Sequence, residues 1–228
     1  MPTSKRRERT ALLYDEDYDE RSRIAERLFF APMRAKLAVA AGPIRGRVVD
    51  LAVSTGKGLG LYRAQDCHVV GVDLSSRALG RAVERAKDLR VSFEPIVADV
   101  MRLPIADESV DCVVCQLGFC TFEDPLAVLR EVRRVCRRDA RVMLVEHVLP
   151  EHRLPRTLAT LAADRAQREF GCDTMRDTLG MFAAEGFVTE FDASAVGGFM
   201  HSTILRPPPR DRSRPSRSDR ASTSGSAA

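Results

Sequence analysis

Three aspartates are the residues whose types and spacing say most about the chemistry of this chain. Asp50, Asp73 and Asp99 each end a short run rich in valine or isoleucine. Such runs are typical of buried parallel strands, and the carboxyl ends of parallel strands meet at one edge of a sheet. The sequence therefore predicts three carboxylates at that edge, placed to accept hydrogen bonds from a bound small molecule.

The predicted carboxylates frame a pocket for a nucleoside that carries a cation rather than a pyrophosphate. Asp50 either holds the turn after its strand through backbone N–H groups or faces a cationic amino group through water. Asp73 is placed to accept from both ribose hydroxyls. Asp99 can accept from an exocyclic adenine amine, while the backbone N–H of Val100 offers a donor to the ring. Apolar walls for a purine are expected from Leu74, Met101 and Leu117.

A glycine-bearing turn, residues 56–60, follows the first of these runs. Gly56 lets the backbone approach a ligand closely because it has no Cβ atom. Alternating glycines alone are weak evidence, since a dinucleotide-binding domain usually shows the spacing G-x-G-x-x-G and a second nucleotide-binding half. This chain has neither feature, so the pattern does not favour a nicotinamide cofactor.

The elements that must position these residues alternate between strand and helix, which predicts an α/β protein. The fold class expected is a doubly wound, seven-stranded, mostly parallel sheet with an antiparallel edge strand, formed by a terminal hairpin. Strands are predicted at 47–52, 68–73, 91–98, 110–116, 141–147, 187–193 and 201–206. Helices are predicted at 19–41, 58–65, 75–88, 125–136, 155–170 and 174–185, and Pro32 is expected to kink or split the first.

The chain is expected to divide into four parts. Residues 1–18 form an N-terminal arm that is partly disordered, and residues 19–42 a cap helix. Residues 43–206 form the main domain, and residues 207–228 a disordered tail rich in Arg, Ser and Pro. The segment from Arg206 to Ala228 holds six Arg and two Asp, so it carries the whole net charge of +4. A basic surface for nucleic acid would therefore depend on this tail alone.

The six cysteines and the lack of a secretory signal favour reduced thiols in a cytoplasmic protein. Cys112 and Cys115 have the spacing of a metal or redox pair, but the valines between them indicate the middle of a strand. No second ligand pair follows at zinc-site spacing, so no metal is expected. No apolar run reaches the roughly 20 residues of a membrane span. The segment 28–33 is apolar enough to contact a lipid surface.

Several motifs together resemble the class I S-adenosylmethionine-dependent methyltransferases. They are residues 48–60, 70–73, 98–99, 107–111 and 129–135. The segments 120–125 and 146–148 resemble most the thiol and phospholipid members of the branch that also holds the ubiquinone and menaquinone methyltransferases. The resemblance covers roughly residues 15–205, and it implies the corresponding Rossmann-like fold and S-adenosylmethionine as the cofactor.

The resemblance extends the predicted cofactor site and also shows departures from the family pattern. Family members usually have glycine at the position of Ser54 and often at that of Ala52, so a Cβ at Ser54 could narrow the methionine pocket. Gln116 is expected to form a hydrogen bond near the methionine portion of the cofactor. Tyr14 and Tyr18 precede the N-terminal helix, in a segment that similar enzymes fold over the cofactor; their alternative role is simple packing of the arm. The turn at residues 137–140 lacks the Pro and Gly that are usual there in family members. This turn is expected to lie away from the cofactor, so the departure should affect only the stability of the protein.

His147, at the end of the fifth strand, is the candidate general base or substrate-orienting residue. In the alternative, His147 has a structural role: it caps the end of the strand or forms a hydrogen bond with a backbone carbonyl. Cys120 lies where substrate would enter and is either reactive or a small buried apolar residue. The segment 151–172 lies where similar enzymes build a substrate lid. Its apolar residues either line a pocket or belong to an ordinary core, which is the default expectation; they are Leu154, Leu158, Leu161 and Phe170.

The function predicted is methyl transfer by in-line displacement to a small apolar or amphipathic acceptor: a thiol, a lipid amine or a quinone precursor. The first alternative is a regulatory or cofactor-binding homologue that has lost transfer because of Ser54. The second is a nucleic-acid methyltransferase that uses the arginine tail. The fourth predicted strand is followed by Gln116-Leu117-Gly118-Phe119, which is not the Asn/Asp-Pro-Pro-Tyr/Phe signature of amino-base methylation. No nucleic acid partner is therefore expected.

Overall fold

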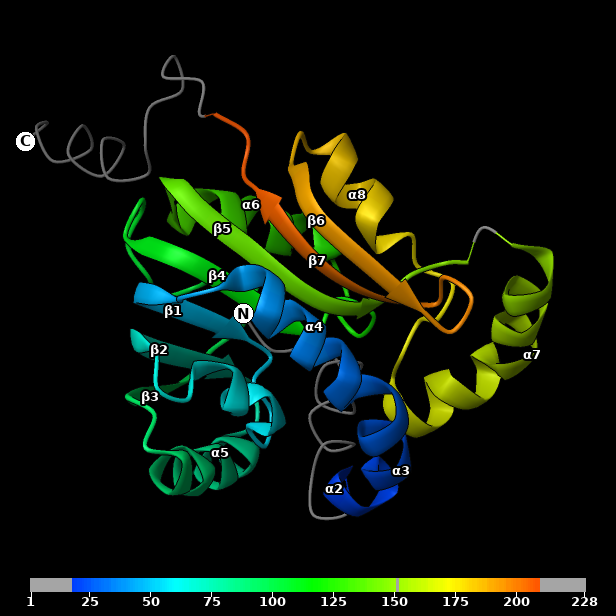
Figure 1. Cartoon of the computed structure of the whole chain (residues 1–228), viewed down its shortest axis with the longest axis horizontal. Coiled ribbons are helices and arrows are strands. Elements are labelled where there is room, and N and C mark those ends of the chain that lie inside the picture. Colours follow the sequence, from blue (N-terminus) through cyan, green and yellow to red (C-terminus); the bar gives the residue numbers. More distant parts are fainter. Residues whose placement is uncertain (1–17, 151, 210–228) are drawn as a thin grey trace, which may run out of the picture.

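The computed structural model describes residues 18–150 and 152–209. It contains a seven-stranded sheet with the order β3-β2-β1-β4-β5-β7-β6 (Figure 1). The strands are β1 (Arg45–Leu51), β2 (Asp66–Asp73), β3 (Phe93–Val97), β4 (Val110–Gln116), β5 (Cys136–His147), β6 (Val188–Ala195) and β7 (Met200–Arg206). Strands β1 to β5 pair in parallel, whereas β7 is antiparallel to both of its neighbours, β5 and β6. The predicted fold class and the hairpin at the sheet edge are confirmed.

Helices cover both faces of this sheet. They are α2 (Tyr18–Arg21), α3 (Arg23–Ala25), the π-helix η1 (Glu26–Phe30), α4 (Ala31–Ala41), the 3₁₀-helix η2 (Lys57–Tyr62), α5 (Ser76–Leu89), α6 (Pro125–Val135), α7 (Arg153–Phe170) and α8 (Thr178–Ala184). Side chains of Ser75, Asp124 and Asp177 accept from backbone N–H groups and begin α5, α6 and α8. Within the described ranges, no helix is long and apolar enough to cross a membrane.

The alternation of side chains along each strand divides the core into two halves. On one face, Val48, Val114 and Met143 pack with apolar residues of α4, η2 and α5. On the other face, Val49 and Val113 pack with residues of α6 and α8. Cys112 belongs to the first half and Cys115 to the second. Because this pair projects from opposite faces of β4, it cannot form one metal or redox site.

The predicted N-terminal helix is divided close to Pro32. Residues 26–30 form a turn of π-helix directly before α4, in which Pro32 occupies the first turn. Proline has no N–H to donate to the preceding turn, so a break in the regular α-helical pattern is expected there. The predicted interruption is therefore present, as a π-helical turn.

Three elements differ most from the prediction in their bounds. Strand β5 begins at Cys136, so residues 137–140 extend the strand and are not a separate turn. Arg137 pairs with Asp111, and no proline or glycine in this segment interrupts the extended backbone. The predicted helix 58–65 is a shorter 3₁₀-helix, and the predicted helix 174–185 begins only at Thr178, after its Asp177 cap.

Helix α7 lies to one side of the sheet in Figure 1. The default expectation that its leucines belong to an ordinary core is wrong: Leu154, Leu158 and Leu161 are exposed by 72%, 59% and 77%. The face that packs inward carries Ala159 instead, which is buried. Ile24 and Leu28, near the chain start, are exposed as well.

Candidate functional site

A cavity of about 1040 Å³, including its open mouth, lies at the carboxyl ends of the parallel strands. The strand order reverses between β1 and β4, and ligands of doubly wound sheets bind at such a switch point. The predicted residues that line it are Asp50, Ala52, Ser54, Asp73, Leu74, Asp99, Val100, Met101, Gln116 and Leu117. The three carboxylates that the sequence placed at one edge therefore share one cavity.

Asp50 is buried at the end of β1, where one carboxylate oxygen accepts a 2.8 Å hydrogen bond from the Tyr62 hydroxyl. The pKa of Asp50 is raised to about 7, chiefly by burial; the Tyr62 hydrogen bond and Arg34 act against this increase, and nearby Asp73 contributes to it. The partner of Asp50 is thus a side chain of η2 rather than the backbone of the turn. A carboxyl that titrates close to neutral pH can respond to the charge of a ligand.

Asp73, at the end of β2, holds the loop after β1 in place. Its two oxygens accept 2.9 Å hydrogen bonds from the backbone N–H groups of Ser54 and Ser75. Burial raises the pKa of Asp73, and backbone hydrogen bonds from Ser75, Ser54 and Leu74 limit the increase. Each carboxylate oxygen can accept more than one hydrogen bond, so Asp73 can also bind a ligand hydroxyl.

The two positions where family members usually have glycine adopt the left-handed conformation. Ala52 has φ 52° and Ser54 has φ 50°. This conformation disfavours residues that carry a Cβ atom, which explains in physical terms why glycine is suited to both positions. The Ser54 hydroxyl lines the cavity, is buried, and has no hydrogen-bond partner in the described structure.

Asp99 and the residues after it form another wall. The Asp99 carboxylate accepts a 2.9 Å hydrogen bond from the N–H of Met101, which fixes the turn that follows β3. Val100 is buried, and it lines the cavity together with Met101 and, from the end of β2, Leu74. This wall therefore combines an acceptor with apolar side chains.

Gln116, at the end of β4, is held by Arg34 of α4. The Arg34 Nε donates a 2.6 Å hydrogen bond to Gln116 Oε1, and the guanidinium also pairs with Glu26. The other terminal atom, Gln116 Nε2, is buried and has no partner in the described residues. At Gly58 a Cβ atom would lie 2.2 Å from Gln116 Nε2, so this glycine lets the backbone of η2 lie close against the Gln116 side chain.

Further residues line the cavity without having been predicted from the sequence; among them are Arg34, Thr55, Lys57, Gly58, Thr121, Phe122 and Glu123. Gly58 belongs to the glycine-bearing turn at residues 56–60, so the sequence pattern could have indicated it. Arg34 had none, because its place in the site depends on how α4 packs across the sheet. Gly56 has φ 77°, and a Cβ atom there would also meet Leu59 and Ala82, so both backbone conformation and packing favour glycine; its close approach to a ligand stays a prediction.

Glu146 organises the loop after β4. It is fully buried, and its Oε1 accepts hydrogen bonds of 2.7 Å and 2.8 Å from the N–H groups of Gly118 and Phe119. Burial raises the pKa of Glu146 to about 7, against the effect of these bonds and of His147. The carboxylate thereby supports the loop whose residues Leu117 and Gly118 line the cavity.

His147, the predicted general base, does not line the cavity. Its Nδ1 lies 3.3 Å from Cys172 Sγ, and its ring stacks on Phe199 with a centroid distance of 5.0 Å. Burial acts to lower the pKa of His147, but Cys120 and Glu146 outweigh it and raise the pKa. A role as base or in orienting the substrate stays a prediction. Tyr14 and the Tyr18 side chain lie outside the described residues.

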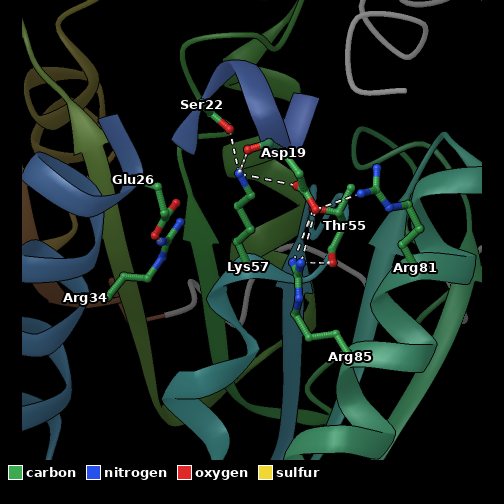
Figure 2. A network of polar contacts seen from close by, with 8 residues as sticks. All are labelled: Asp19, Ser22, Glu26, Arg34, Thr55, Lys57, Arg81 and Arg85. Atoms are coloured by element: carbon green, nitrogen blue, oxygen red, sulfur yellow. Dashed lines mark hydrogen bonds and ion pairs between the residues drawn. The ribbon is translucent and has the colours of Figure 1, made fainter. Parts of the chain in front are cut away.

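A network of polar contacts ties the first helix to the cavity loops (Figure 2). The Asp19 carboxylate pairs with Lys57, Arg81 and Arg85, and it accepts a 2.7 Å hydrogen bond from Thr55. Lys57 also donates to Ser22, at 2.6 Å. Burial raises the pKa of Asp19, but Thr55, Lys57 and Arg85 more than offset this effect and hold it below its usual value. Helix α2 is therefore fastened across the loop that contains Thr55 and Lys57.

A doubly wound sheet with a carboxylate-lined cavity at its switch point is the arrangement in which α/β proteins bind nucleotides and related ligands. Residues 49–144 match the family model described as a methyltransferase domain. The resemblance to S-adenosylmethionine-dependent methyltransferases is confirmed, and the matched segment runs from β1 into β5, across the strand ends that form the cavity.

Comparison with curated proteins finds relatives that match this domain. The chain is 39% identical over 106 residues to demethylmenaquinone methyltransferase of Thermotoga maritima, covering 46% of this chain and 44% of that protein. It is 34% identical over 106 residues to phosphatidylethanolamine N-methyltransferase of Cereibacter sphaeroides, covering 45% and 51%. The chain thus spans about half the length of the curated relatives it matches.

Solved structures share the fold over most of the chain. Geranyl diphosphate C-methyltransferase from Streptomyces coelicolor A3(2) superposes with a TM-score of 0.69 at 13% identity, covering 91% of this chain and all of that chain. A putative methyltransferase in complex with the Trm112 activator of Haloferax volcanii gives 0.67 at 19% identity, covering 88% and 99%. At these identities the likeness concerns the fold.

Proposed function

We propose that this protein is an S-adenosylmethionine-dependent methyltransferase that acts on a small apolar or amphipathic acceptor. The observation that supports the proposal most is the meeting of Asp50, Asp73 and Asp99 at one cavity within the methyltransferase domain. A cationic nucleoside suits this cavity, because carboxylates favour a nearby positive charge and accept from hydroxyl and amino groups.

The residues present fit the cofactor. Two buried polar atoms that face the cavity, Ser54 Oγ and Gln116 Nε2, have no partner in the described structure, and buried polar groups normally have one. Asp73 would bind the ribose, and Asp99 with the N–H of Val100 would bind the adenine between apolar side chains. Gln116 and Arg34 would hold the methionine carboxylate.

S-adenosylmethionine supplies, when bound, a methyl group on a sulfonium that is already a good leaving group. The protein then needs to hold the acceptor in line and to exclude water, and such orientation is worth about 7–11 kcal/mol. No nucleophilic side chain is required. Phe122 and Thr121, in the loop that Glu146 supports, line the cavity and would help to position the acceptor.

An apolar or lipid-like acceptor is supported by two observations. The curated relatives include proteins named for demethylmenaquinone and for phosphatidylethanolamine. The exposed leucines of α7 and the exposed Leu28 and Phe29 of η1 give the protein apolar surface for peripheral contact with a membrane. Thiols are kept among the proposed acceptors because the segments 120–125 and 146–148 resemble those of thiol methyltransferases.

The test is an acceptor screen with methyl-labelled cofactor. Full-length protein is incubated with alkyl thiols, phosphatidylethanolamine vesicles and quinols, and label in the product is counted. The expected result is transfer to at least one class, and a strong reduction in Asp73→Asn. Cofactor binding without transfer to any class would contradict the proposed activity and favour a cofactor-binding homologue.

A further inference from the structure

Two cysteines and a histidine from three separate elements meet beside the cavity. Cys120 lies in the loop after β4, His147 ends β5, and Cys172 follows α7. The Sγ atoms and one ring nitrogen all lie within 4.8 Å of one another. The three residues are separated by 27 and 25 positions in the sequence, so no short spacing pattern indicates the cluster.

The cluster is held by contacts around it. The N–H of Asp173 donates a 2.8 Å hydrogen bond to the Cys120 carbonyl, which joins the segments that carry both thiols. His147 stacks on Phe199 and contacts Phe30, and this packing orients its Nδ1 toward Cys172 Sγ at 3.3 Å. Both cysteines are buried, and all six cysteines of the chain are free.

We propose that Cys120, His147 and Cys172 bind a soft divalent metal ion, with Zn²⁺ as the ion that fits best. A tetrahedral zinc with Zn–S near 2.3 Å and Zn–N near 2.0 Å places its ligand atoms roughly 3.5–3.8 Å apart. The distance of 3.3 Å between His147 Nδ1 and Cys172 Sγ is close to this spacing, and the other ligand atoms lie within 4.8 Å, so shifts of about 1 Å or less reach this geometry. Thiolate and imidazole are preferred ligands of zinc, whereas magnesium and calcium prefer oxygen.

The charge balance of such a site is favourable. Both thiols lose their protons on binding, and the two thiolates neutralise the ion, so no net charge is buried. Three protein ligands leave a fourth position for water or another ligand, which is the arrangement of open zinc sites. Cys120 stands between Gly118 and Thr121, both of which line the cavity, so the ion would lie next to the proposed methyl-transfer site.

The proposal is tested by titrating full-length, metal-free protein with Co²⁺, whose thiolate complexes absorb in the near ultraviolet and visible. The expected result is one equivalent bound, with sulfur-to-metal charge-transfer and tetrahedral d–d bands, and displacement by Zn²⁺. Absence of stoichiometric binding, or recovery of a Cys120–Cys172 disulfide in place of the metal, would overturn the proposal.

Variants assign the ligands without relying on enzyme activity. Cys172→Ser and His147→Gln should each lower the affinity for Co²⁺ by roughly 100-fold or more, since each removes one of three ligands. Cys67→Ser is the matched control, because Cys67 is a free thiol on β2 outside the cluster, and it should bind Co²⁺ as the wild type does. Circular dichroism confirms that each variant is folded. An equal loss of Co²⁺ affinity in the Cys67 variant, or no loss in the other two variants, would show that the metal does not bind at this cluster and would overturn the proposal.

Discussion

At the scale of single residues, Asp50 makes the proposed cofactor site sensitive to pH. Burial raises its pKa from 3.8 to about 7 in the folded protein. Because the folded value exceeds the unfolded one, Asp50 favours folding at low pH, and this stability is lost as the pH rises from about 4 through about 7. A cationic ligand favours the ionised carboxylate, so the same residue should strengthen ligand binding as the pH rises.

The first prediction concerns this ligand binding. The affinity for S-adenosylmethionine should rise by up to about tenfold between pH 6 and pH 8, since a carboxyl with a pKa of about 7 goes from roughly one-tenth to roughly nine-tenths ionised over this interval. Asp50→Asn should bind more weakly and remove that dependence. Glu146, whose pKa is also about 7, supplies the matched control. Glu146→Gln should keep the pH dependence of the affinity, because that dependence is due to Asp50. A slope that survives in Asp50→Asn would assign the titration to another group.

The second prediction concerns the left-handed residues of the cavity loop. Ser54→Gly should stabilise the protein by up to about 1 kcal/mol, because relief of an unfavourable φ of 50° exceeds the entropy that glycine loses on folding. The same exchange at Ser76, in the first turn of α5, should destabilise it by a few tenths to about 1 kcal/mol. Urea unfolding of both variants measures the difference, and a destabilised Ser54→Gly would show that the Ser54 side chain makes a necessary contact.

Residue types alone identified much of the cavity. The acids at the strand ends were predictable because a buried β-branched run that ends in a carboxylate leaves few places for the acid except the sheet edge. Arg34 and Glu146 were not predicted as site residues. Their roles depend on tertiary contacts. Arg34 donates a hydrogen bond to Gln116, and Glu146 accepts hydrogen bonds from two backbone N–H groups of the loop after β4.

At the scale of elements, the fastening of α2 across the cavity loop depends on one carboxylate. Asp19 contacts Lys57, Thr55, Arg81 and Arg85, and these partners come from η2, from the loop before it and from α5 (Figure 2). Because its pKa is held below 3.8, Asp19 stays ionised through neutral pH, and its stabilising effect is lost only as the pH falls below about 4.

The third prediction follows from this arrangement. Asp19→Asn should lower stability by about 1 kcal/mol, after allowance for solvent screening of the partly exposed pairs, and should increase hydrogen exchange of the amides in residues 19–30. Glu20→Gln is the control, since Glu20 lies beside Asp19 in the sequence and its ion pair with Arg23 is exposed. Unchanged exchange in Asp19→Asn would mean that apolar packing alone holds α2 in place.

The elements themselves were largely predictable, and the largest misplaced boundary, the start of β5, has a physical cause. The central strands are continuous buried runs, and α5 and α6 have side-chain caps, so local sequence determines them. Strand β5 instead begins early through pairing of Val110 with Cys136 and through the ion pair of Arg137 with Asp111. Such long-range contacts leave no periodic pattern in the segment that they organise.

At the scale of the whole molecule, α7 presents leucines that the rest of the described structure does not cover. Leu154, Leu158 and Leu161 lie on the exposed side of this helix, close in sequence to Arg153, Arg156 and Arg165. Apolar residues next to arginines are typical of surfaces that bind anionic lipid. This arrangement supports the lipid-like acceptor proposed above.

The fourth prediction is that Leu154→Ser combined with Leu158→Ser lowers binding to anionic phospholipid vesicles about tenfold or more, because two exposed apolar contacts are lost. Sedimentation of the protein with vesicles measures this binding. Leu126→Ser, an exposed leucine of α6 on another part of the molecule, is the control. Equal binding of all variants would mean that α7 does not contact lipid.

The measurement that tests the central claim most directly is calorimetric titration of the full-length protein with S-adenosylmethionine at neutral pH. If the cavity at the carboxyl edge of the sheet holds the cofactor, one molecule should bind per chain, S-adenosylhomocysteine should compete, and Asp73→Asn should weaken binding by about 1–3 kcal/mol, or roughly 5- to 150-fold. The absence of binding by the folded wild-type protein, or equal affinity in Asp73→Asn, would contradict the account.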